Sequence, residues 1–190
     1  MTNSAASTQI EEQEEPKRAG QENVHQDSAR SHILVLFVDD RHGALDRIVG
    51  HLRRRRANTQ TFAIGQSEIP HVVRITVVME DSEVGVEQLV EQLRKVVDVR
   101  NITNLSMDQA IVRELALIKV NSAATLQHEI IEIGHLFGAH AVYVDLETVT
   151  LEVSGSAEKV EKLVSQLQPY GIREVARSGC VAMKRGSGEM

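Results

Sequence analysis

Apolar residues in the first half of the chain alternate between strand-like runs and helical stripes. Residues 33–38 form a continuous apolar run, which is typical of a strand buried on both faces. Apolar side chains recur at helical spacing through residues 44–52, and again from Val86 to Val97, where Ser82 is placed to cap the helix. Further strand-like runs occupy residues 58–65, 72–79 and 99–105. The predicted order of elements is therefore βαββαβ.

The second half of the chain repeats this order of patterns. One predicted helix has an apolar face at Leu126, Ile130, Ile133 and Phe137. Ser156 is placed to cap a second helix, whose inward side chains are Val160, Leu163, Val164 and Leu167. The predicted strands are residues 115–120, 141–145, 148–153 and 172–176, the middle two forming a hairpin.

Matching positions indicate that one unit has been duplicated. His51 of the first half corresponds to His135 of the second, and Ser82 corresponds to Ser156. The duplication predicts an α+β fold of two tandem ferredoxin-like βαββαβ units, each with a four-stranded antiparallel sheet and both helices on one face. The other face of each sheet needs a cover. We expect the two units to pack side by side or sheet to sheet, and copies of the chain to dimerise through sheet edges.

Residues 1–30 differ in composition from the rest of the chain. They include six acidic and three basic residues, so they carry −3 of the total net charge of −6. Few of them are large and apolar, so burial cannot offset the entropy lost on ordering. We expect a disordered acidic tail, which is either simply solvated or used for interaction. The remainder divides into residues 31–108, residues 109–186 and a short tail at 187–190.

Composition narrows the classes of function. The chain of 190 residues has ordinary hydrophobic and charged fractions, but only 3% aromatic residues and no Trp. The scarcity of aromatics and the negative net charge argue against nucleic-acid binding. The single Cys180 excludes an internal disulfide or a Cys-rich metal site and fits a reducing compartment. Neither a membrane-spanning run nor a signal-peptide core is present, so we expect a cytoplasmic protein that does not bind membranes.

The segment between the first predicted strand and helix is a candidate binding site. It runs from Asp40 to Leu45 and contains Gly43. Free N–H groups at a helix N-terminus attract a carboxylate or phosphate, and a glycine allows a ligand to approach the backbone. Asp40 could receive an ammonium group, and together these features describe an amino-acid site. The alternative is that Asp40 only caps the helix and Gly43 only relieves a tight turn.

Two other groups of residues are less specific. Residues 53–56 are four consecutive arginines at the end of the same helix. They form either a solvated charged face, which is favourable near a helix C-terminus, or a site for phosphate, nucleic acid or an acidic partner. His128, His135 and His140 lack the spacing of a metal-binding helix, so we expect no metal site. No catalytic motif occurs, and Cys180 is best interpreted as a small buried hydrophobe.

Several segments together resemble a known family. They are Gly43-Ala44-Leu45-Asp46-Arg47-Ile48-Val49-Gly50, Asn58, Arg74-Ile75-Thr76-Val77, Gln92-Leu93, Val97-Asp98-Val99, Arg113-Glu114-Leu115-Ala116-Leu117-Ile118-Lys119-Val120 and Glu174-Val175-Ala176-Arg177-Ser178-Gly179. In this order they resemble the small, regulatory subunit of acetolactate synthase, also called acetohydroxyacid synthase, over some 155 residues. The first half resembles its ACT domain, and the second half is ACT-like.

The resemblance implies a noncatalytic subunit of branched-chain amino-acid synthesis. Such a subunit binds a large thiamine-diphosphate-dependent catalytic subunit, raises its activity and confers feedback inhibition by valine. The resemblance places thiamine diphosphate, Mg and FAD in the catalytic partner and no cofactor in this chain. It implies that the effector valine contacts Asp40 and the backbone N–H groups of Gly43, Ala44 and Leu45, with Asn58 reaching the site from the other protomer of an ACT-domain homodimer.

Asp40 departs from the family pattern, which usually has Asn three positions before the glycine. A carboxylate accepts a hydrogen bond from the valine ammonium more strongly than an amide does, but it cannot donate, and it repels a nearby carboxylate. The competing interpretation of the chain is a stand-alone tandem ACT regulator that senses amino acids. The arginines at 53–56 and the acidic tail favour that class, and the absence of a DNA-binding module disfavours it.

Overall fold

The computed structural model describes residues 30–186. The expected acidic tail, apart from Arg30, and the expected short tail at 187–190 therefore lie outside the described residues. Arg30 itself is the first residue of strand β1. Across the described part of the chain, no helix is long and apolar enough to span a membrane.

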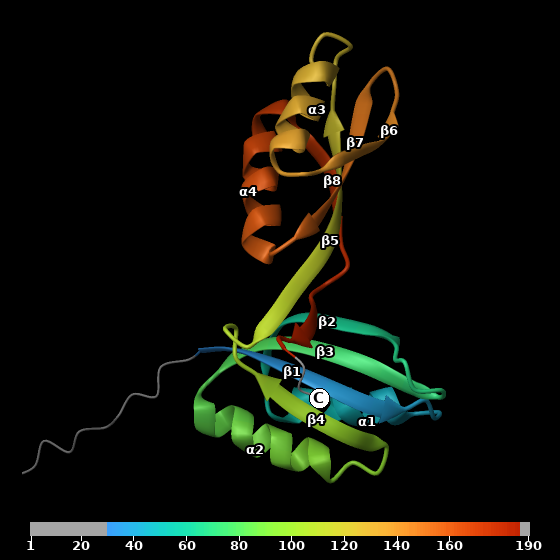
Figure 1. The fold of residues 1–190 in the computed structure, drawn as a ribbon, viewed down its shortest axis with the longest axis vertical. Coiled ribbons are helices and arrows are strands. Elements are labelled where there is room, and N and C mark those ends of the chain that lie inside the picture. The colour runs from blue at the N-terminus through green and yellow to red at the C-terminus, as the bar shows by residue number, and fades with distance from the viewer. Residues whose placement is uncertain (1–29, 187–190) are drawn as a thin grey trace, which may run out of the picture.

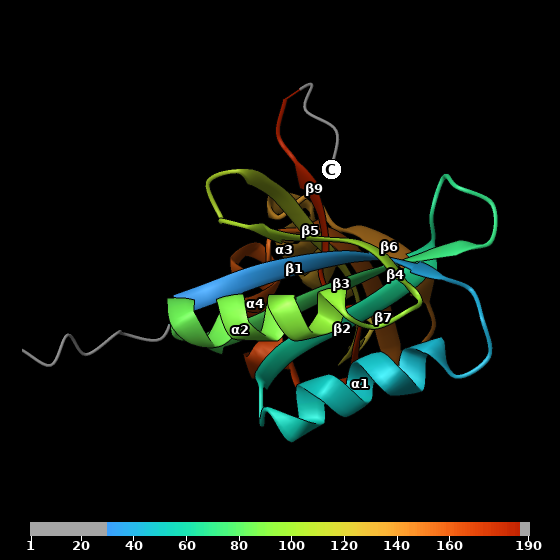
Figure 2. The same ribbon diagram turned by 90° about the horizontal axis from the view of Figure 1, so that it is seen from below.

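The first unit is a four-stranded antiparallel sheet with two helices on one face (Figure 2). Its strands lie in the order β2-β3-β1-β4. Leu34, Leu36 and Val38 of β1 face the helices and belong to a buried apolar core, which confirms the buried central strand. The elements of this unit are β1 (Arg30–Asp39), α1 (Ala44–Arg54), β2 (Asn58–Gln66), β3 (Val72–Asp81), α2 (Glu83–Arg94) and β4 (Val99–Leu105).

The second unit repeats this arrangement with the strand order β6-β7-β5-β8. Ala116, Ile118 and Val120 of its central strand pack against side chains of both helices. The fold is therefore the predicted tandem of ferredoxin-like units. The elements of the second unit are β5 (Ala110–Asn121), α3 (Gln127–Leu136), β6 (His140–Val144), β7 (Thr148–Gly155), α4 (Ala157–Leu167), the 3-10 turn η1 (Gln168–Tyr170), β8 (Ile172–Arg177) and β9 (Val181–Lys184).

Both predicted serine caps are confirmed. The Ser82 hydroxyl accepts a hydrogen bond from the Gly85 N–H at 3.1 Å, and the Ser156 hydroxyl accepts one from the Lys159 N–H at 3.3 Å. The predicted inward position of Val97 is wrong, because α2 ends at Arg94 and the Val97 side chain is 79% exposed. Val97 follows Leu93 at helical spacing in the sequence, but the backbone has already left the helix at that position.

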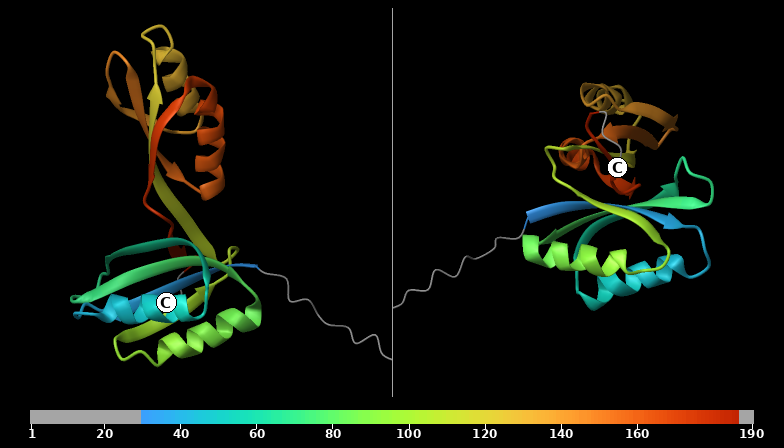
Figure 3. Two further views of the ribbon diagram at one scale, coloured as in Figure 1. Left: turned by 180° about the vertical axis from the view of Figure 1, so that it is seen from behind. Right: turned by 60° about the horizontal axis from the view of Figure 1, so that its bottom comes forward.

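The face of the first sheet opposite α1 and α2 is covered by a two-stranded ribbon rather than by the second sheet (Figures 1 and 3). Strand β5 extends beyond its own sheet, and β9 pairs with this extension from Ala110 to Arg113. Ala110 and Ala182 of the ribbon pack with Val35 and Phe37 of β1. The expectation of side-by-side or sheet-to-sheet packing is therefore wrong. The first part of β5 pairs with β9 and packs on the first sheet, and the rest of β5 is the central strand of the second sheet.

Contacts between residues distant in the chain hold the ribbon in place. The Arg74 guanidinium donates to the Ala182 carbonyl at 2.6 Å and lies 5.1 Å from the centre of the Phe37 ring. The Cys180 N–H donates to the Thr61 hydroxyl at 3.4 Å. Cys180 is buried in the same apolar cluster, which raises the pKa of its thiol and confirms its interpretation as a small hydrophobe.

Candidate functional site

Gly43 begins α1 in a conformation that favours glycine. Its φ is +77°, in the left-handed region, and a Cβ added there would lie 3.3 Å from the Nη1 atom of Arg47. The helix has no side-chain cap, so the alternative in which Asp40 is the N-cap is wrong. Asp40 is instead exposed, and its backbone N–H donates to the His71 carbonyl at 2.9 Å. Its carboxylate is therefore free of the capping role.

The first turn of α1 leaves backbone donors available. The Ala44 N–H donates to the Arg41 carbonyl at 3.1 Å, and the Arg47 N–H donates to the Gly43 carbonyl at 3.2 Å. Among residues 30–186, no acceptor pairs with the N–H groups of Leu45 and Asp46. These two donors at the positive end of the helix dipole can hold a carboxylate. Of the backbone contacts expected at Gly43, Ala44 and Leu45, the Ala44 donor is thus already used within the turn.

An ion pair between Arg47 and Asp98 fixes this turn against the rest of the domain. Both Nε and Nη2 of Arg47 lie 2.7 Å from Oδ2 of Asp98, whose side chain is buried. The backbone carbonyl of Asp98 also accepts from the Asp39 N–H at 2.8 Å. The hydrogen bond between the side chains lowers the pKa of Asp98 and raises that of Arg47. Sequence reasoning assigned neither residue a role, although an isolated Asp between Val97 and Val99 is a signal of a paired buried carboxylate.

The lowered pKa of Asp98 predicts a pH-dependent loss of stability. A carboxyl with a depressed pKa stabilises the fold above its unfolded pKa of about 3.9, and this contribution disappears as the pH falls through the lower, folded value. We expect Asp98→Asn to be less stable than the unaltered chain at about pH 7, with the difference shrinking below about pH 4. Urea unfolding between about pH 3 and pH 7 measures this difference in the free energy of unfolding.

Asp46→Asn is the matched control, since it removes an exposed carboxylate from the first turn of the same helix. A difference between Asp98→Asn and the unaltered chain that stays constant down to about pH 3 would contradict the role of the Arg47–Asp98 pair.

Asn58 lies at the other end of α1 from Gly43. The two positions are separated by 14 residues, 11 of which form the helix, itself about 16 Å long. The Asn58 amide donates to Glu80 at 3.4 Å. Within one chain the structure therefore brings Asp40, Gly43, Ala44 and Leu45 together but leaves Asn58 apart. Asn58 begins β2, the outer strand of its sheet, where a second copy of the chain has access to it.

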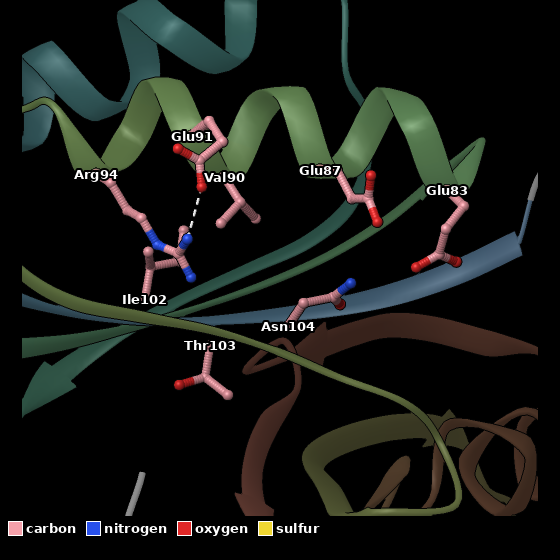
Figure 4. A pocket seen from close by; sticks show the side chains of 8 residues that line it. All are labelled: Glu83, Glu87, Val90, Glu91, Arg94, Ile102, Thr103 and Asn104. Carbon is pink, nitrogen blue, oxygen red and sulfur yellow. Dashed lines mark hydrogen bonds and ion pairs between the residues drawn. The ribbon is translucent and has the colours of Figure 1, made fainter.

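A larger groove than the cleft beside α1 lies elsewhere, between α2 and β4 (Figure 4). It has a volume of about 630 Å³, and Glu83, Glu87 and Glu91 point into it from successive turns of α2. Arg94 is paired with Glu91 at 2.6 Å. The remaining carboxylates repel an anionic ligand, so this groove does not suit an amino-acid carboxylate. Throughout residues 30–186, no three His, Cys, Asp or Glu side chains gather closely enough to hold a metal ion.

Two βαββαβ units in tandem, the first with open backbone donors where its first helix begins, define a chain of the tandem ACT class. A family model described as the acetohydroxyacid synthase small-subunit-like ACT domain matches residues 34–101, and one described as the small subunit of acetolactate synthase matches residues 113–186. The chain belongs to the acetolactate synthase small-subunit family. The resemblance noted from the sequence is thereby confirmed, together with its place in branched-chain amino-acid biosynthesis.

Individual relatives agree with this assignment. The chain is 41% identical to the acetolactate synthase small subunit of Mycolicibacterium smegmatis, over 82% of this chain and 92% of the relative. It is 40% identical to that of Bacillus subtilis, over 82% of this chain and 91% of the relative. The crystal structure of the small subunit from Thermotoga maritima superposes with a TM-score of 0.78 at 28% identity, covering 84% of this chain and 99% of that one.

Proposed function

We propose that this chain is a noncatalytic regulatory subunit that activates the large acetolactate synthase catalytic subunit and makes it sensitive to valine. Thiamine diphosphate, Mg and FAD belong to that partner in this proposal. The observation that carries it is the open first turn of α1, with free donors at Leu45 and Asp46 close to the exposed Asp40, in a chain whose two halves both match the family. The match of residues 113–186 favours this function over a stand-alone amino-acid sensor.

In the proposed site, each end of valine has a complementary group. The backbone donors of Leu45 and Asp46 hold the carboxylate, and Asp40 accepts a hydrogen bond from the ammonium. Gly43 keeps a side chain away from the approach to these donors. Asn58 of a second copy completes the site when two first domains pair through their β2 edges. The half-exposed side chain of Leu45 offers an apolar contact for the isopropyl group.

Regulation then follows from linkage between two equilibria. Valine that binds between two protomers favours the dimer arrangement in which it binds best. The catalytic subunit is inhibited only to the extent that valine binds the inactive arrangement of the complex more tightly than the active one. In this proposal the assembly is cytoplasmic, and the small subunit contacts neither nucleic acid nor membranes.

Reconstitution of the holoenzyme tests the proposal. The purified full chain is added to its catalytic subunit, and acetolactate formation is measured with and without valine. We expect the small subunit to raise the activity and valine to lower the activity of the complex but not that of the catalytic subunit alone. An unchanged activity on adding the small subunit, or valine inhibition of the catalytic subunit alone, would overturn the proposal.

A further inference from the structure

A cleft with cationic walls lies between α1 and the end of α2. Its volume is about 440 Å³, and its polar lining consists of Arg47, His51 and Arg54 from one side and Gln92 and Lys95 from the other. The three α1 side chains are spaced four and three residues apart, so they share one face of the helix. None of the residues that line this basic cleft is acidic.

The positive charge around the basic cleft is only partly neutralised. Arg47 is paired with the buried Asp98. Arg55 donates to the amide oxygens of Gln88 and Gln92, which leaves its charge uncompensated. Within residues 30–186, no carboxylate forms an ion pair with Lys95 or with any of the arginines at 53–56, all of which are exposed. Five exposed cations at the ends of α1 and α2, two of which line the cleft, therefore have no carboxylate partner among residues 30–186.

The sequence also contains an acidic segment that precedes the described residues. Glu11, Glu12, Glu14 and Glu15 put four carboxylates within five residues. The chain enters the described fold at Arg30, which pairs with Asp81 of β3, while the neighbouring Glu80 pairs with Asn58 of β2. Arg30 and Asn58 are thus two strand spacings apart, about 10 Å. Asn58 follows the last of the four arginines by two residues.

The connecting residues are long enough for the acidic segment to reach the cleft. Glu15 precedes Arg30 by 15 positions, and 15 residues can span at most about 50 Å. The cleft extends from the end of α1 toward its start, a helix about 16 Å long. Tethering at this distance corresponds to an effective concentration on the order of millimolar, so weak exposed ion pairs can act together.

We propose that residues 11–15 dock on the basic cleft. The acidic groove along α2 and β4 is the other large groove described near α2, and its glutamates repel the same segment (Figure 4). The basic cleft offers the opposite charge. Arg54 lies at the end of α1 nearer to Arg30, whereas Lys95 lies toward the other end of β1, because Val99 pairs with Val38. That end is eight strand residues from Arg30, about 27 Å, which is within reach of a 15-residue connection. Docking there makes the segment a competitor of any acidic surface that approaches α1. This proposal does not depend on valine binding.

Zero-length carbodiimide cross-linking of the full chain tests the proposal, because this reagent joins a carboxylate to a lysine in direct contact. We expect mass spectrometry to find peptides joining residues 11–15 to Lys95 at an ionic strength of about 0.01 M. Their yield should fall about tenfold or more at about 1 M, where the screening length is about 3 Å. The triple variant Arg53→Gln, Arg54→Gln, Arg56→Gln keeps Lys95 but should lose most of the cross-link at low salt.

The matched control is Lys159→Gln, Lys162→Gln, Lys184→Gln, which removes the same number of positive charges from the second domain and the ribbon. It should leave the cross-link to Lys95 unchanged. A cross-link to Lys95 no more abundant than one to the exposed Lys184 in the unaltered chain, or insensitive to salt, would overturn the proposal. A second result would also overturn it: inorganic triphosphate protects Lys95 from chemical acetylation, and Lys95 forms no cross-link to residues 11–15. The cleft would then bind a phosphate ligand.

Discussion

Gly43→Trp should abolish valine binding, with no heat detected by isothermal titration calorimetry of the full chain. Any side chain at this position takes on a left-handed φ of +77°, at a cost of about 1–2 kcal/mol. The added Cβ also meets Nη1 of Arg47 at 3.3 Å, so an indole must displace the Arg47 side chain, which lies one turn from the open donors of Leu45 and Asp46. The reconstituted holoenzyme should correspondingly lose its inhibition by valine.

Gly50→Trp is the matched control for this substitution. Gly50 lies on the same helix, has no positive φ and faces open space, with nothing within 4 Å of an added Cβ. This variant carries the same indole but should bind valine as the unaltered chain does. Equal valine binding by the Gly43 and Gly50 variants would remove the site from the first turn of α1.

Ala182→Asp should destabilise the first domain by about 3 kcal/mol or more. Ala182 is 4% exposed and packs with Val35 and Phe37 under the ribbon, so an aspartate there places a charge inside an apolar cluster. Its backbone carbonyl also accepts the hydrogen bond from Arg74, which displacement of the ribbon would break. Equilibrium urea unfolding, followed by circular dichroism, measures the change.

Met183→Asp provides the control from the neighbouring position. Met183 is 62% exposed on the opposite face of the same strand, so its replacement should change the free energy of unfolding by less than about 0.5 kcal/mol. Similar losses of stability for the two variants would show that β9 does not cover the first sheet as the structure places it.

Much of the fold could be predicted from the sequence because it depends on local patterns. The serine caps at Ser82 and Ser156 and the buried stripe of α4 follow from residue spacing alone. The site was only partly predictable. Gly43 was identified as a turn glycine, but the role of Asp98 was not, because its partner Arg47 is 51 residues away in the chain.

The sequence by itself determined the order of elements within the two βαββαβ units, the duplication and the family, since periodicity, caps and motifs are properties of neighbouring residues. It did not predict β9 (Val181–Lys184), which follows the second unit. Only the tertiary structure decided that a ribbon covers the first sheet, that Gly43 rather than Asp40 begins α1, and that Asn58 lies away from Gly43 within one chain. The contact between Arg74 and Ala182 joins residues 108 positions apart. Such a contact depends on how completed strands and helices pack, which no local pattern of apolar and polar residues specifies.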